Sequence, residues 1–310
     1  MLDLAIVIVN YNTRDLLADC LRSVEANGEL ERRAVIVVDN ASSDGSVEMV
    51  RRVYPWVQLI ACDENGGYAR ANNIGLRAVG FGQEEPQSPP MEALPRYALL
   101  LNPDTVLPPD ALSTLLAFMD SHPNIGIVGP KLVRLDGSLD KACRRGFPTP
   151  ATSFYHLSGL AKLFPHSPRF GRYSMSFLDP DEQADVDSVV GAFMLMRTTA
   201  LEQAGLLDEA FFMYGEDIDL AYRIKSYGWR VVYHPAVTVL HVKGAASRQS
   251  SRRAIVAFYD AMKIFHDKHY RAESLFLTNW AIDLGVSLLR NVALLQDRLR
   301  PSGRKRVASA

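Results

Sequence analysis

The segment from residue 211 to residue 220, Phe-Phe-Met-Tyr-Gly-Glu-Asp-Ile-Asp-Leu, contains the residues best suited to chemistry. Glu216, Asp217 and Asp219 fall within four positions, directly after an aromatic run and a glycine. Carboxylates so close repel one another, and an apolar wall beside them changes their affinity for protons. The pattern favours a carboxylate oriented for proton abstraction. The alternative is a solvated helix N-terminus, where negative charge is also favourable.

The first half of the chain predicts the elements that would position such a residue. Four short apolar runs predict buried strands at residues 4–9, 34–38, 57–61 and 97–101. The segments between them predict a helix capped by Thr13, a short helix with Val47, Val50 and Val53 facing inward, a helix within 65–79 and a helix opened by Pro108 and Pro109. Apolar strands separated by amphipathic helices indicate an α/β fold with a mainly parallel, Rossmann-like sheet covered by helices on both faces.

Four polar clusters follow these strands or lie near one. They are Asn10-Tyr11-Asn12, Asp39-Asn40, Asn65-Gly66-Gly67 and Asn102-Pro103-Asp104-Thr105. In open parallel sheets, ligands bind beyond the carboxyl ends of the strands. We therefore expect the four clusters to line a single edge of the sheet and to form a binding site there.

Side chains in these clusters suit a nucleotide. Asp39 can accept hydrogen bonds from a nucleobase or a ribose, or can cap its own turn. Tyr11 can stack on a base or simply pack. Gly66 permits close backbone approach, and Arg70 can meet a phosphate. The chain lacks the glycine-rich phosphate loop and the dinucleotide fingerprint, which argues against those two modes of nucleotide binding.

Asp104 is the strongest candidate metal ligand, since hard cations such as Mg²⁺ and Mn²⁺ take few protein carboxylates and fill their shell with phosphate oxygens. His241 follows a predicted strand and could supply a nitrogen ligand, or could be a hydrogen-bonded structural histidine. The helix that begins near Asp217 is expected to be buried through Leu220, Ile224 and Tyr227.

Composition excludes other classes of protein. The 34 basic residues balance 35 acidic ones, so no overall charge points to nucleic acid. Three scattered cysteines form neither a disulfide framework nor a zinc site, and indicate a reducing compartment. The apolar run at 4–9 lacks a basic leader and a cleavage site, so a buried strand is favoured over a signal peptide. We expect the protein in the cytosol or on the cytosolic face of a membrane.

Three regions depart from the α/β pattern. Residues 82–95 are rich in Pro, Glu, Gln and Ser and predict an exposed insertion with little order. Residues 138–185 show poor periodicity with many aromatic and basic side chains, so they form either a lid facing the acceptor or irregular packing without function. Residues 251–310 predict a C-terminal helical appendage attached to a domain of residues 1–250.

The appendage combines an amphipathic helix with a basic tail. Residues 272–295 are strongly apolar but contain three charges, so a spanning helix is not expected. From residue 290 to 306 there are six basic residues and one acidic residue, and six minus one gives a net charge of +5. Residues 272–306 therefore suit docking on an anionic membrane surface. The alternative is a helix packed on the catalytic domain or in a dimer, followed by a solvated tail.

Taken together and in this order, the motifs resemble those of the family 2 glycosyltransferases, and in particular the bacterial rhamnosyltransferase-like branch. The resemblance covers about residues 4–245 and rests on the polar clusters together with Tyr214-Gly215-Glu216-Asp217-Ile218-Asp219-Leu220. It implies a GT-A fold, a nucleotide-diphosphate sugar donor, a divalent cation (Mg²⁺ or Mn²⁺) and inversion at the anomeric carbon. One departure is that the family's D-x-D metal motif is Asn102-Pro103-Asp104 here, which leaves a single carboxylate.

The resemblance also implies roles for individual residues. Asp39 and Tyr11 would hold the base, Asp104 the metal with His241 as a further ligand position, and Asp217 would be the general base. Arg70 and the metal would offset charge on the departing diphosphate. Glu216 and Asp219 would bind acceptor hydroxyls or hold their loop. The donor-side set is Asn10, Tyr11, Asn12, Asp39, Asn65, Gly66, Arg70, Asn102 and Asp104.

The expected activity is inverting transfer of a sugar, most simply L-rhamnose from dTDP-rhamnose, to a glycan or polyprenyl-linked acceptor of a bacterial surface polysaccharide. The alternatives are a transferase that uses a UDP- or GDP-sugar, a sugar-nucleotide pyrophosphorylase, and a non-catalytic nucleotide-sugar binding or scaffold protein. The pyrophosphorylase needs a basic glycine-rich loop near the N-terminus, and Asn10-Tyr11-Asn12 is not one. The scaffold would not need the Asp104 and Asp217 carboxylates, and both are present.

Overall fold

The computed structural model describes residues 2–28, 32–83, 90–242 and 251–299. Its first half alternates strands and helices as the sequence predicts. The elements are β1 (Leu4–Asn10), α1 (Arg14–Ala26), β2 (Arg33–Asp39), α2 (Ser46–Val53), β3 (Gln58–Ala61), α3 (Tyr68–Ala78), a 3₁₀ turn (Met91–Ala93) and β4 (Tyr97–Leu101). Successive residues of β2 belong to two different apolar clusters, Val37 to one and Val38 to the other. Both faces of the sheet are therefore covered, which explains the uninterrupted apolar runs.

Two local predictions were wrong. Thr13 precedes α1 but its side chain does not cap the helix; its hydroxyl donates instead to Asn10 Oδ1 at 2.7 Å. Instead, the Asp44 carboxylate, which belongs to another segment, accepts from the Arg14 N–H at 2.8 Å and satisfies this backbone donor at the start of α1. On α2, Val50 is buried but Val53 is 50% exposed, because that helix is short and covers the sheet with one turn only.

The second half of the chain completes the sheet in the order β3-β2-β1-β4-β8-β6-β9-β5, with β7 paired to β9. Strands β3, β2, β1 and β4 are parallel, whereas β8 runs antiparallel to both β4 and β6. The sheet is thus parallel in its N-terminal part and mixed beyond β4. The remaining elements are β5 (Thr105–Val106), α4 (Ala111–Ser121), β6 (Ile125–Val133), a 3₁₀ turn (Lys141–Cys143), α5 (Pro150–Leu157), α6 (Leu160–Leu163), β7 (Ala184–Asp185), β8 (Phe193–Arg197), α7 (Thr198–Ala204), α8 (Glu216–Ser226), β9 (Arg230–His241), α9 (Ser251–His269) and α10 (Phe276–Leu299).

The two irregular regions differ in outcome. Within 82–95, residues 84–89 lie outside the described residues, while Leu94 is buried against the core. Within 138–185, the short helices α5 and α6 leave Phe154 and Leu163 exposed, at 62% and 69%. Arg145, from the same region, is directed inward and lies 3.6 Å from Asp217. This region therefore contributes to the site and also presents apolar side chains at the surface.

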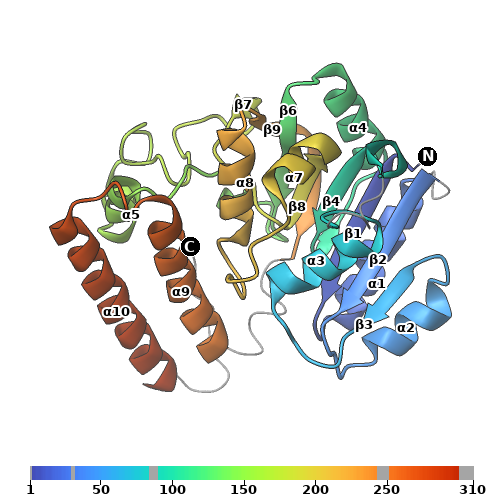
Figure 1. Ribbon diagram of the computed structural model, residues 1–310, viewed down its shortest axis with the longest axis horizontal. Coiled ribbons are helices and arrows are strands. Elements are labelled where there is room, and N and C mark those ends of the chain that lie inside the picture. Colours follow the sequence, from blue (N-terminus) through green and yellow to red (C-terminus); the bar gives the residue numbers. More distant parts are fainter. Residues whose placement is uncertain (1, 29–31, 84–89, 243–250, 300–310) are drawn as a thin grey trace.

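Helices α9 and α10 form a hairpin at the end of the molecule opposite α2 and β3 (Figure 1). The hairpin packs on α8 through Phe211, Ile218, Ala261 and Phe265. The predicted domain boundary at residue 250 falls at the end of 243–250, which lies outside the described residues.

The side of α10 that faces α9 makes polar contacts and also contains the partly buried Ile282, Val286 and Leu294. Asp283 accepts from Arg271 Nη2 at 2.8 Å, Arg290 pairs with Asp260 at 3.1 Å, and Asn279 bonds His266 at 2.7 Å. The opposite side is apolar and exposed. Its residues and their exposed fractions are Leu277 73%, Trp280 58%, Leu284 44%, Leu288 55%, Val292 51%, Leu295 58% and Leu299 76%. We call this set the α10 outer face.

The α10 outer face does not belong to a membrane-spanning helix. Among the described residues, none of the helices combines the length and the hydropathy that crossing a bilayer requires. The segment is helical as predicted, and the row of apolar side chains on the α10 outer face is directed away from the protein.

Candidate active site

The ends of β1 and β2 bring Asn10 and Asp39 together, because the two residues are paired in the parallel register of these strands. Asp39 is buried, and its carboxylate accepts from Asn10 Nδ2 at 2.9 Å and from the Ser42 N–H at 2.8 Å. These are the contacts of a residue that holds its own turn. Recognition of a nucleobase by Asp39 stays a prediction.

Residues after β1 extend the same edge. Asn12 adopts φ 50°, and its Oδ1 accepts from the Ser43 N–H at 2.7 Å, so the turns that follow β1 and β2 are joined. Tyr11 is partly exposed between them. Its stacking on a base stays a prediction.

The glycine loop before α3 connects this edge to the acidic segment. Asn40 Nδ2 donates to Asn65 Oδ1 at 3.0 Å and to the Gly67 carbonyl at 3.1 Å. Gly67 has φ 93°, and a Cβ there would lie 2.4 Å from the Phe212 carbonyl oxygen, so only glycine fits. The Tyr68 N–H donates to the same carbonyl at 2.7 Å. The loop predicted to meet the donor thus contacts the residues that precede Glu216.

Arg70 does not join this network. Its guanidinium pairs with Glu64 at 2.9 Å, and both side chains are more than half exposed. A Cβ at Gly66 would lie 2.9 Å from Arg70 Cδ and 3.2 Å from its Nη1, so the Arg70 side chain lies beside this glycine. A phosphate contact from Arg70 stays a prediction and would require this exposed pair to open.

Asp104 and His241 meet because Thr105 of β5 is paired with His241 of β9. His241 Nε2 lies 3.3 Å from Asp104 Oδ1, and Nδ1 lies 2.9 Å from Asp140 Oδ2. Burial alone would lower the pKa of His241, but the two carboxylates outweigh burial and raise it to about 9.

The residues around Asp104 fit a divalent cation. Asn102 Oδ1 is buried and has no hydrogen-bond partner among the described residues, and Asp104 Oδ1 is buried with His241 Nε2 beside it at 3.3 Å. A buried oxygen without a donor is unfavourable unless a cation or a ligand satisfies it. The part of the chain that the structure describes contains no cluster of three or more acidic, histidine or cysteine ligands. Asp104 and His241 would therefore hold a cation whose remaining ligands come from a substrate diphosphate.

Asp217 lies at the start of α8 and is 4% exposed. Its Oδ2 accepts from the Gly191 N–H at 3.1 Å and lies 3.6 Å from Arg145 Nη1, and its Oδ1 accepts from the Ile218 N–H at 2.8 Å. Two backbone donors, a guanidinium and the N-terminus of a helix stabilise a carboxylate in a fixed orientation.

Glu216, one residue earlier, has a different environment. It is 5% exposed, and its Oε2 has no hydrogen-bond partner in the described structure. Burial, followed by repulsion from Asp217, raises the pKa of Glu216 from 4.5 to about 8. Neighbouring carboxyl groups whose environments differ in this way commonly take different roles in proton chemistry.

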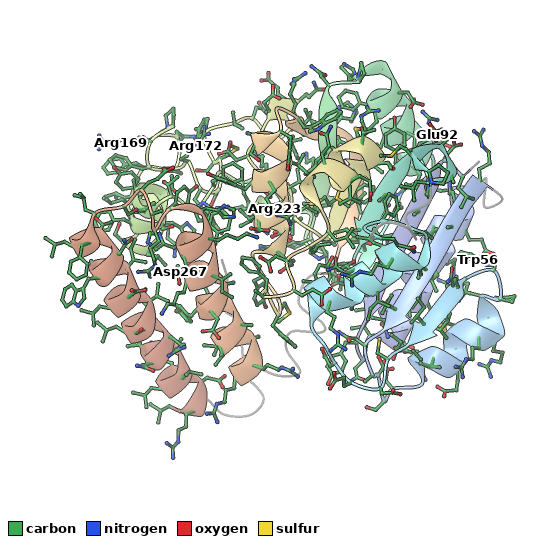
Figure 2. The ribbon with its side chains drawn as sticks, in the orientation of Figure 1. Trp56, Glu92, Arg169, Arg172, Arg223 and Asp267 are labelled. Atoms are coloured by element: carbon green, nitrogen blue, oxygen red, sulfur yellow. The ribbon has the colours of Figure 1, made fainter. Side chains whose placement is uncertain are left out.

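Asp219 is fully buried and does not face a substrate. Its oxygens lie 2.7 Å from His269 Nε2, 2.8 Å from Arg223 Nε and 2.9 Å from Lys268 Nζ. Burial would raise the pKa of Asp219, but these three partners outweigh it and lower the pKa to about 2. Of the two predicted roles, binding acceptor hydroxyls does not fit this geometry. Asp219 instead joins α8 to α9, and Arg223 lies on α8 between the sheet and the C-terminal hairpin (Figure 2).

The burial predicted for α8 is confirmed for Leu220 and Ile224 but is wrong for Tyr227, which is 60% exposed. Tyr227 falls in the last turn, where the chain approaches Gly228 (φ 88°) and leaves the core.

Three residues that complete the site were not predicted to take part in it. Arg145 reaches Asp217, Asp140 orients His241, and the Gly191 N–H donates to Asp217. Arg145 comes from the irregular region 138–185, whose abundance of arginine was the only signal. Asp140 and Gly191 carry no motif, because their roles arise from pairing between distant strands.

This arrangement has counterparts among known proteins. The model of the family described as glycosyltransferase like family 2 matches residues 3–255. The chain therefore belongs to glycosyltransferase family 2 and is a glycosyltransferase.

Among curated relatives, the chain is 29% identical over 308 residues to an N-acetylglucosaminyl-diphospho-decaprenol L-rhamnosyltransferase of Mycobacterium tuberculosis, covering 98% of this chain and 96% of the relative. It is 29% identical over 240 residues to rhamnosyltransferase WbbL of Escherichia coli K12, covering 76% and 82% of the two chains.

Among solved structures, the chain is similar to the mannosyltransferase PcManGT of Pyrobaculum calidifontis in complex with GDP-Man and Mn²⁺. The TM-score is 0.56 at 17% identity, covering 94% of this chain and 72% of that one. TarS of S. aureus gives 0.54 at 16% identity, with the same two coverages. The predicted GT-A fold with a C-terminal helical appendage is confirmed.

Proposed function

We propose that this enzyme transfers L-rhamnose from dTDP-rhamnose to a sugar carried on a polyprenyl diphosphate, with inversion at the anomeric carbon, during synthesis of a bacterial surface polysaccharide. Two relatives named as rhamnosyltransferases support the sugar, and the decaprenol relative, matched over nearly its whole length, supports the lipid-linked acceptor. A UDP- or GDP-sugar is the alternative donor, since the solved structures similar in fold carry GDP-Man or UDP-GlcNAc.

The single observation that carries the catalytic assignment is the setting of Asp217. In an inverting transfer, a base removes the proton of the acceptor hydroxyl as its oxygen attacks the anomeric carbon opposite the leaving diphosphate. Asp217 has a fixed orientation, because Arg145 and two N–H groups contact its two oxygens. When bound at Asp104 and His241, a divalent cation neutralises the charge of the departing diphosphate.

Asp217→Asn tests the assignment. The amide keeps the size of the side chain but cannot accept the proton, so we expect transfer to fall by about 10²–10⁴-fold. Binding of the donor, measured by calorimetry, should be unchanged, because Asp217 lies on the acceptor side. Near wild-type transfer by a correctly folded variant contradicts the proposed base.

The donor is identified by calorimetric titration with UDP, dTDP, GDP and their sugars, each with and without Mn²⁺. We expect Mn²⁺-dependent binding of dTDP, and loss of that dependence in Asp104→Asn. Binding of UDP or GDP but not of dTDP would identify the donor as a UDP-sugar or a GDP-sugar instead of dTDP-rhamnose. Absence of binding to all three would favour the scaffold alternative.

We further propose that the enzyme works as a peripheral protein on the cytosolic face of the inner membrane, where residues 272–306 contact the lipid. The α10 outer face supports this, since its large apolar side chains are exposed from Leu277 to Leu299 while Asp283 and Arg290 bond to residues of the α9 segment. The sequence that follows is basic. An apolar face beside cationic residues is typical of helices that lie in an anionic membrane surface.

Co-sedimentation with vesicles tests this placement. We expect the protein to sediment with vesicles of anionic lipid and to be partly released by salt, because both apolar and electrostatic contacts contribute. Failure to bind anionic vesicles, combined with a stable dimer in solution, would favour the dimer alternative for this face.

A further inference from the structure

Glu216 and Asp217 are adjacent, yet they differ in the hydrogen-bond donors that the protein provides to their carboxyl oxygens. Asp217 receives two N–H donors and lies 3.6 Å from Arg145. Glu216 Oε2 is buried without a hydrogen-bond partner in the described part of the chain. The carboxyl group does accept a hydrogen bond from its own backbone N–H, so the unsatisfied atom is Oε2. A buried carboxylate oxygen with no donor is unfavourable, whereas a protonated carboxyl needs an acceptor for its O–H.

The groups around Glu216 favour a single negative charge on the pair. Asp217 and Asp219 of α8 repel a charge on Glu216, and the Tyr68 hydroxyl faces the same region from the start of α3. Arg145 is the facing cation, and it lies closest to Asp217. Arg145 can therefore compensate only one carboxylate, and its position selects Asp217.

We propose that Glu216 is protonated in the working enzyme and that its Oε2–H donates a hydrogen bond to an oxygen of the acceptor sugar beside the attacking hydroxyl. This inference rests on the proposed function and adds a substrate contact to it. A neutral acid at this position can hold the acceptor without competing with Asp217 for the transferred proton. The buried oxygen that lacks a partner then acquires one when the acceptor binds.

The proposal has a consequence for the pH dependence of the reaction. The pKa of Glu216 is raised to about 8, so the O–H donor is present below that pH and is lost above it. The wild-type kcat/KM for the acceptor should therefore fall by about tenfold per pH unit above that value, because the ionised form presents only acceptor oxygens.

The test compares Glu216→Gln and Glu216→Ala with wild type between about pH 6 and pH 10. Glutamine retains a donor that does not titrate, so Glu216→Gln should keep its rate near pH 7 within about threefold and should lose the decline above pH 8. Glu216→Ala should lose about tenfold or more at pH 7, mostly through KM for the acceptor. Glu48→Gln, at an exposed position of α2, is the matched control and should reproduce the wild-type profile.

A decline that persists unchanged in Glu216→Gln, or full activity in Glu216→Ala, overturns the inference while leaving the role of Asp217 intact. The role of Asp217 is tested separately by Asp217→Asn. If the Glu216 variants fold poorly, the infrared difference between the wild-type protein at pH 7 and at pH 10 decides instead. A carboxylic-acid carbonyl band that is present at pH 7 and lost at pH 10 supports a protonated Glu216, and its absence at pH 7 overturns the inference.

Discussion

In most proteins charged side chains are exposed and large apolar side chains are buried. Helices α8 and α10 depart from this pattern in opposite ways. At its N-terminus, α8 buries three carboxyl groups, whereas α10 exposes a row of large apolar side chains while Asp283 bonds to Arg271 on its inner side. Both choices oppose stability, since burying charge and leaving Leu or Trp in water are each unfavourable. Protein folds retain such features where function requires them. The comparison therefore separates the region to which we assign the chemistry from the region that we propose meets the membrane, with α9 between them (Figure 1).

The largest effect on activity should come from removing the guanidinium of Arg145, which lies beside the buried carboxyl groups of α8. Arg145→Met keeps an unbranched apolar stem in place of the aliphatic part of arginine but leaves Asp217, Glu216 and Asp140 without the guanidinium that faces them. We expect kcat to fall by about 100-fold, since a carboxylate whose partner is removed loses its orientation and its charge state. Steady-state kinetics at saturating donor provides the measurement. Arg169→Met, in the same region but at the surface, serves as the control. An unchanged kcat would show that Arg145 is not needed by the base.

The second-largest effect should come from changing Asp219, which joins α8 to α9. Asp219→Asn removes the charge that His269, Arg223 and Lys268 share. The pKa of Asp219 is lowered from 3.8 to about 2, so the carboxylate stabilises the fold at pH values above about 4, and that stabilisation is lost as the pH falls toward 2. We expect the variant to lose about 2 kcal/mol in free energy of unfolding at pH 7 and about half of that at pH 3. Urea unfolding at the two pH values measures the difference. A difference that grows at low pH would contradict the assignment.

The exposed region is tested by making it polar. Leu284→Gln combined with Leu288→Gln should weaken binding to anionic vesicles by about tenfold, because two half-exposed leucines no longer enter the lipid. Transfer to a short water-soluble acceptor should be unchanged, since neither residue contacts the active site. Val53→Gln is a matched control, because Val53 is an apolar side chain, 50% exposed, on α2 at the other end of the molecule. Equal loss in both variants would mean that general surface polarity governs vesicle binding.

The smallest effect should be on the free energy of unfolding when the α10 outer face is made polar. The same Leu284→Gln, Leu288→Gln pair should change the free energy of unfolding by less than about 0.5 kcal/mol, since exposed positions contribute little to folding. Thermal or urea unfolding without lipid checks this. A loss of several kcal/mol would instead show that the α10 outer face is covered in the folded protein, as in a dimer.

The parts of the candidate active site that could be predicted from the sequence are those whose structure is determined by residues close together in the chain. The strands β1 to β4, the turns that follow them, and the acidic start of α8 carry strong local patterns of apolar periodicity, glycine and capping residues. Asp104 and His241 were predicted to share one metal site, and the pairing of Thr105 with His241 places them 3.3 Å apart. The mixed part of the sheet was not predicted, because the direction of β8 depends on pairing partners far away in the chain.

By itself, the sequence determined that this chain has an α/β fold with polar turns at one edge of the sheet, an acidic segment suited to proton abstraction and an amphipathic C-terminal helix. Each of these follows from residue types within a few positions of one another. Only the tertiary structure decided which carboxyl group contacts a guanidinium and a distant backbone N–H, because these come from Arg145 and Gly191, 72 and 26 residues away from Asp217. Tertiary packing likewise decided that the polar side of α10 faces inward, since the ion pairs with Arg271 and Asp260 leave its apolar side exposed to the surroundings.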